Sequence, residues 1–150
     1  MNNLKSINEF MGQKHIAVAG VSRTKQKFGN TIFQELSKKG YNVYPVNPNL
    51  EEFEGKKCFK NIESLPAEVT GIVINTKPNV TAALIKDAEA KGIKNIWLQQ
   101  GSADKKIKSE TGKSQSNIIT GQCILMFNEP VKGIHGFHRW LKKSFGKFPN

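Results

Sequence analysis

The alternation of short continuous apolar runs with stretches of helical periodicity constrains the fold of this chain most. Strands that alternate with helices form a parallel sheet through right-handed crossovers. Runs without polar alternation, such as TGIVIN, are typical of strands covered on both faces. We therefore predict one α/β domain with a Rossmann-like, doubly wound, mainly parallel five-stranded sheet and helices on both faces. The predicted strands are residues 15–19, 42–46, 70–75, 95–98 and 117–120.

Local signals refine the first half of this prediction. The helix after the first strand has an inner face marked by Ile32 and Leu36, and Thr31 and Gln34 suit a capping box at its start. Pro45 has no N–H to donate to a ladder, so the second strand is expected near an edge or at a bulge.

The remaining connections differ in character. Residues 47–66 carry no regular period, so an irregular connection is expected there. Pro78 opens a helix that stops at Gly92, because proline suits the first helical turn and glycine the end. Two further helices are predicted, a short one at residues 3–11 and a Lys-rich surface helix within 102–113.

Composition excludes several classes of protein. No apolar run exceeds about six residues, too short for a membrane span. The N-terminal residues 1–5 are polar, unlike a secretory signal. Cys58 and Cys123 lack metal-type spacing and are interpreted as reduced thiols of a cytoplasmic protein.

The formal net charge of +11 favours an acidic partner. Only Arg23 and Arg139 are arginines, whereas specific nucleic-acid readers favour arginine for bidentate contacts. Specific recognition of nucleic acid is therefore disfavoured. A solvated basic surface, a phosphate-rich small molecule and non-specific nucleic-acid binding remain open.

Residues 131–150 are predicted to form a basic amphipathic C-terminal helix. Docking on the domain or on a second subunit, as in a homodimer, is the preferred interpretation, with a membrane surface or nucleic acid as alternatives. His135 and His138 lie within it, but no carboxylate or cysteine partner suggests a metal site. Its apolar residues are Ile134, Phe137, Trp140, Leu141 and Phe145.

The loop after the first strand is the first candidate site, because open parallel sheets bind ligands at the carboxyl ends of their strands. Gly20 permits a tight turn, and the following amides with the next helix N-terminus form a phosphate seat. Ser22 offers a hydroxyl. Positive charge comes from Arg23, Lys25 and Lys27.

A nicotinamide dinucleotide fits this loop poorly. The G-x-G-x-x-G fingerprint would need glycine where Ser22 and Lys25 stand. The acid that holds a ribose 2′-hydroxyl is also missing after the second strand, where Asn47 and Pro48 are followed by no acid before Glu51. A nucleotide with a phosphorylated ribose is not disfavoured by these departures.

Six motifs in this order resemble the small CoA-binding domain proteins, which are similar to the N-terminal domain of the succinyl-CoA synthetase α subunit. The resemblance covers roughly residues 13–127. Gln122 departs from the proline of the family's G-P-N-C turn. The motifs are Gly20-Val21-Ser22-Arg23, Lys27-Phe28-Gly29, Tyr44-Pro45-Val46-Asn47-Pro48, Asn75-Thr76-Lys77-Pro78, Trp97-Leu98-Gln99-Gln100-Gly101 and Gly121-Gln122-Cys123.

The resemblance implies a site for coenzyme A or an acyl-CoA. Its phosphates would meet the loop formed by Gly20, Val21, Ser22, Arg23 and Lys27, with Phe28 and Gly29 completing the motif. Asn47 and Pro48 would lie near the adenosine moiety, and Thr76, Lys77 and Pro78 would flank adenine or the pantetheine arm. Gln100 and Gly101 would approach the distal arm.

No combination of acid, base and nucleophile is evident. The synthetase's phosphorylated histidine belongs to a domain absent here, His15 is interpreted as structural, and Cys123 as buried and inert. We therefore expect a non-catalytic carrier, sensor or accessory protein. The alternatives are an NAD(P)-dependent oxidoreductase, an acyl-CoA ligase subunit and a nucleic-acid-binding regulator.

Overall fold

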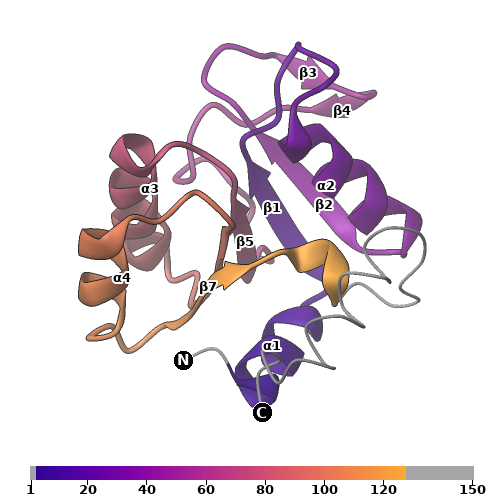
Figure 1. Cartoon of the computed structure of the whole chain (residues 1–150). Helices are drawn as coiled ribbons and strands as arrows, with labels where there is room; N and C mark the ends of the chain where they lie inside the picture. The colour runs from indigo at the N-terminus through magenta and orange to yellow at the C-terminus, as the bar shows by residue number, and fades with distance from the viewer. Residues whose placement is uncertain (1–2, 128–150) are drawn as a thin grey trace.

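The computed structural model describes residues 3–127, which fold around a five-stranded sheet in the order β2-β1-β5-β6-β7 (Figure 1). Every neighbouring pair in this sheet is parallel. The α/β, Rossmann-like prediction is therefore confirmed. The strands are β1 His15–Ala19, β2 Asn42–Val46, β5 Gly71–Ile74, β6 Asn95–Gln99 and β7 Asn117–Gln122.

Helices cover both faces of the sheet, as predicted. Helices α1 and α2 lie on one side, whereas α3 and α4 lie on the other (Figure 1). A short 3₁₀ turn, η1, follows β7 and joins the first side. The bounds are α1 Leu4–Met11, α2 Phe28–Lys38, α3 Pro78–Lys91, α4 Lys105–Thr111 and η1 Ile124–Met126.

Two apolar layers form the core because successive strand side chains point to opposite faces. Val18 faces the layer of α1 and α2, and its neighbour Ala17 faces the layer of α3 and α4. Trp97 is fully buried in the first layer, with its ring edge-on to Phe10 at a centroid distance of 5.4 Å. Its indole N–H donates to the carbonyl of Gln122 at 3.1 Å, which satisfies the buried polar atom.

The start of α2 differs from the sequence prediction. The helix begins at Phe28 with Lys27 as its N-cap, so Thr31 already lies inside it and the predicted Thr31–Gln34 capping box is wrong. In the first turn of this helix, Gly29 packs closely on the backbone of Gly20. Phe28 and Gly29 are thus helical residues.

The segment after β2 contains a hairpin that the sequence did not predict. Strands β3 (Glu52–Phe53) and β4 (Lys56–Lys57) pair antiparallel. The turn residues Glu54 and Gly55 both have positive φ, 48° and 78°, as a two-residue hairpin turn of type I′ requires. Each strand has only two residues, so no alternating pattern long enough to detect exists in the sequence.

The outer position of β2 confirms the expectation from Pro45. Its exposed side is partly covered by Phe59, whose N–H donates to the Pro45 carbonyl at 2.9 Å.

Both cysteines are free and buried. Within residues 3–127, no helix has the length and apolar character needed to cross a membrane. The predicted helix at 131–150 lies outside the described residues.

Candidate functional site

The carboxyl ends of β1 and β5 adjoin at the centre of the sheet. The chain runs from β1 through α2 to β2 on one side, and from β5 through α3 to β6 on the other. This is the point where strand order reverses and where open α/β sheets bind ligands. Residues 20–27, called here the β1–α2 loop, leave β1 at this point.

Two glycines of the predicted motif lie at close backbone contacts. Gly20 has φ 124°, and a Cβ there would overlap the carbonyl of Asn75 at the end of β5. A Cβ on Gly29 would overlap the Gly20 carbonyl oxygen. The β1–α2 loop is therefore pressed between β5 and α2, which only residues without a side chain permit.

The side chain of Asn30, in the first turn of α2, organises the interior of the loop. Its Oδ1 accepts the backbone N–H of Ser22 at 2.8 Å. Its Nδ2 donates to the carbonyls of Ser22 at 2.9 Å and Thr24 at 3.1 Å. Sequence reasoning missed Asn30, since nothing in the motif distinguishes an inward-facing asparagine from an exposed one.

Asn47 holds the loop from the other side. Its Nδ2 donates to the Val21 carbonyl at 2.7 Å, and its Oδ1 accepts the N–H of Asn49 at 2.7 Å. The Arg23 guanidinium donates to the Asn49 carbonyl at 2.9 Å. The predicted residues Arg23 and Asn47 are thus brought together, and the exposed Pro48 lies between the two asparagines.

Positive electrostatic potential gathers where α2 and α3 begin. Both helices have a lysine as N-cap, Lys27 and Lys77, with no capping side chain and no acid in the first turn. By contrast, the Asn3 and Asp104 side chains cap α1 and α4. Helix N-termini attract anions, and these two carry added cations.

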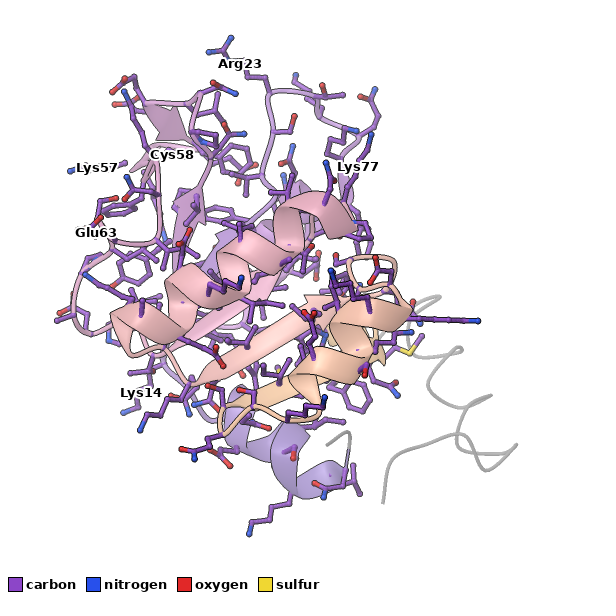
Figure 2. The ribbon with its side chains drawn as sticks, turned by 90° about the vertical axis from the view of Figure 1, so that its left-hand side faces the viewer. Lys14, Arg23, Lys57, Cys58, Glu63 and Lys77 are labelled. Atoms are coloured by element: carbon purple, nitrogen blue, oxygen red, sulfur yellow. The ribbon has the colours of Figure 1, made fainter. Side chains whose placement is uncertain are left out.

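Figure 2 shows Arg23 and Lys77 at the same end of the molecule, with Lys14 at the opposite end. Lys77 comes from the N-terminus of α3 and Arg23 from the β1–α2 loop. The cations predicted from sequence therefore share one end of the sheet. An anionic ligand at this end would have both helix N-termini and both side chains within the same region.

A groove of about 520 Å³ opens beside the β1–α2 loop. Glu52 and Glu54 of the hairpin line it together with the cations Arg23 and Lys25. Gln34 Nε2 donates to Glu54 Oε1 at 2.6 Å. From the sequence we noted that no acid follows the second strand before Glu51, but we did not predict that Glu52 and Glu54 would line this groove. The lining consists of Ser22, Arg23, Lys25, Asn30, Gln34, Leu50, Glu52, Phe53 and Glu54.

The motif after β5 also lies at this edge of the sheet. Thr76 Oγ1 is 2.8 Å from the hydroxyl of Thr81, which is fully buried in α3. Pro78 is the first residue of α3, as predicted. This pair of hydroxyls fixes the turn that carries Lys77 into α3.

Gln100 and Gly101 follow β6, which β5 separates from β1. The Gln100 side chain reaches the Gly121 carbonyl at 3.5 Å, and Gly101 has φ 87°. These two residues are on the same carboxyl edge as the β1–α2 loop but farther along the sheet. They are placed to meet only an extended ligand.

Among residues 3–127, no three His, Cys, Asp or Glu side chains gather as a metal site. His15 lies at the start of β1, away from the loop, with Nδ1 2.8 Å from the Tyr44 hydroxyl. The Sγ of the buried Cys58 lies 3.8 Å from the Asn47 carbonyl. Burial raises the pKa of this thiol.

Comparison with known proteins identifies the family. Residues 14–129 match the family described as CoA binding domain. The chain belongs to this family. The resemblance seen in the sequence motifs is thereby confirmed.

Relatives include both enzyme subunits and small proteins. The chain is 36% identical to the α subunit of acetate–CoA ligase [ADP-forming] II from Pyrococcus furiosus. The match covers 81% of this chain but only 29% of the length of that subunit. A solved structure of a conserved hypothetical protein from the same organism shares 37% identity and a TM-score of 0.70, covering 74% of this chain and 96% of that one. The solved structure of a hypothetical protein from Pyrococcus horikoshii shares 27% sequence identity with this chain and has a TM-score of 0.74. The match covers 86% of this chain and 92% of that one.

Proposed function

We propose that this CoA-binding domain protein binds coenzyme A, free or acylated, at the carboxyl edge of its sheet. The observation that carries the proposal is the pair of α-helices, α2 and α3, that begin beside the strand-order reversal with lysine N-caps and no capping side chain. Phosphate groups satisfy such helix N-termini and neutralise such cations. Membership of the family supports CoA as the source of those phosphates.

In this proposal the phosphates of CoA meet the β1–α2 loop, through Ser22, Arg23 and Lys27. The adenosine moiety lies near Asn47 and Pro48, beside the groove of about 520 Å³. An amide at Asn47 donates to a ribose phosphate without the repulsion that a carboxylate would bring. The pantetheine arm then passes Thr76, Lys77 and Pro78 towards Gln100 and Gly101.

The domain is proposed to act without catalysing a reaction alone, as a carrier, sensor or accessory protein. A second candidate is a subunit of an acyl-CoA ligase, favoured by the 36% identity to the acetate–CoA ligase α subunit. Copurification of partners, followed by an assay for ADP formation with acetate, CoA and ATP, separates the two. Formation of ADP only with a copurified partner would favour the ligase subunit.

Competition calorimetry at fixed ionic strength tests the ligand. Coenzyme A should bind more tightly than dephospho-CoA, since each lost charge-assisted bond costs on the order of 1.5–3 kcal/mol. NAD should bind more weakly than both, because it also lacks the pantetheine arm. Added salt should reduce the preference if the 3′-phosphate contact is solvent-exposed. Tighter binding of NAD than of CoA would overturn the proposal.

Native mass spectrometry of protein purified from cells provides an independent test. A retained ligand reports its own mass, which identifies the acyl group as well as the cofactor. The same measurement gives the mass of the assembly and so tests whether the protein forms a homodimer. A retained nicotinamide dinucleotide would favour the oxidoreductase alternative.

A further inference from the structure

Asn30 is a polar side chain buried directly beneath the β1–α2 loop, with only 4% of its surface exposed. A primary amide offers two N–H donors and an oxygen acceptor. Here both donors and the acceptor are used by the backbone of Ser22 and Thr24. Because the Ser22 N–H can only donate, the orientation of the Asn30 amide follows from the bonding pattern itself.

These bonds decide which loop groups face outward. The Ser22 N–H is directed to Asn30, and the Thr24 N–H donates to the Ser22 hydroxyl oxygen at 3.1 Å. Neither amide is therefore directed at a ligand. The Ser22 hydroxyl, with one lone pair occupied by Thr24, retains its hydrogen for donation.

We propose that Asn30 is the positioning residue of the phosphate site, setting the loop so that phosphate is bound by the Ser22 hydroxyl and the loop cations instead of by the Ser22 and Thr24 amides. The inference rests on the proposed function and adds how the site is built. Burial matters because an amide hydrogen-bonded away from water keeps its partners in one arrangement. The loop is thus ordered before the ligand arrives, which lowers the cost of binding.

The test compares Asn30→Ala and Asn30→Asp with Ser37→Ala in the same helix. Ser37 is a matched control, since its Oγ has no hydrogen-bond partner among residues 3–127. Asn30→Asp keeps an acceptor for Ser22 but turns carboxylate oxygen towards two carbonyls. Calorimetry with CoA and ADP, NMR titration with adenosine, and thermal melting are measured on each full-length variant.

Both Asn30 variants should bind CoA and ADP on the order of 10- to 100-fold more weakly, the effect of losing two or three hydrogen bonds. Adenosine, which has no phosphate, should bind them as it binds the parent protein. Ser37→Ala should match the parent with all three ligands. An equal loss for adenosine would indicate general unfolding and overturn the positioning role.

Amide hydrogen exchange on the unaltered protein tests the inference without a variant that risks unfolding. The Ser22 amide should be protected in the ligand-free protein and should change little when CoA binds. Rapid exchange that slows on CoA binding would overturn the inference while supporting CoA binding. Failure of the parent protein to bind CoA and ADP would overturn the proposed function and this inference with it.

Discussion

Gly29, in the first turn of α2, packs against the carbonyl oxygen of Gly20 so closely that a Cβ at position 29 would overlap it. The neighbouring atom belongs to backbone, which cannot rotate away as a side chain does. Loop and helix therefore touch through their main chains. This contact brings the β1–α2 loop to the N-terminus of α2, where a phosphate site requires it.

Replacing Gly29 with alanine should destabilise the protein, because the added methyl group must displace either the loop or the helix. We expect a loss of about 1–3 kcal/mol in the free energy of unfolding, typical of overpacking. Gly112→Ala is the matched control, since its Cβ would meet no atom closer than 3.6 Å. Chemical denaturation of both variants measures the difference, and equal stability would contradict the packing argument.

Removing the loop cations should weaken CoA binding and leave the fold intact. Arg23→Ala and Lys27→Ala should each cost about 1–2 kcal/mol of binding free energy, as expected for charge-assisted hydrogen bonds. Both side chains are exposed, so melting temperatures should change little. Lys14→Ala at the opposite end of the molecule (Figure 2) controls for net charge. Unchanged CoA affinity in both loop variants would remove the loop from the site.

Deleting residues 131–150 should lower the melting temperature and leave CoA affinity nearly unchanged. The apolar side chains of this segment are expected to cover apolar surface on the domain or on a second subunit. A groove of about 510 Å³ lined by α1, Tyr41 and Phe127 lies at the end of the sheet opposite the β1–α2 loop. Calorimetry and light scattering measure stability and solution size. No change in either would favour the membrane and nucleic-acid alternatives.

The Cys58 thiol should react slowly with alkylating reagents until the pH is well above the ordinary thiol pKa. Burial raises the pKa of Cys58 because the thiolate is desolvated, so the protonated form persists to higher pH. The folded state should lose stability as pH rises from the unfolded thiol pKa towards the raised folded one. Rates are measured in a Cys123→Ser background. A reactivity midpoint at the ordinary thiol value would contradict this expectation.

The local sequence pattern was sufficient to predict an element where each residue type in it has a single physical role. Continuous apolar runs located the five strands, and Pro78 and Gly92 located the limits of α3. Gly20 was correctly placed in the loop, whereas Gly29, expected at the end of the loop, lies in α2, and the contact between the two glycines was not foreseen. The Thr31–Gln34 capping box was wrong because α2 begins three residues before Thr31, at Phe28, with Lys27 as an N-cap that makes no side-chain capping bond.

The sequence by itself determined the fold class and the family, and it led to the proposal of the phosphate loop, because periodicity and motif order are properties of neighbouring residues. Only the tertiary structure decided that β1 lies between β2 and β5, that Glu52 and Glu54 enter the groove, and that Asn30 faces inward. These features depend on backbone contacts between distant segments. An asparagine has the same local pattern whether it meets solvent or two carbonyls, and only the packed chain settles which it meets.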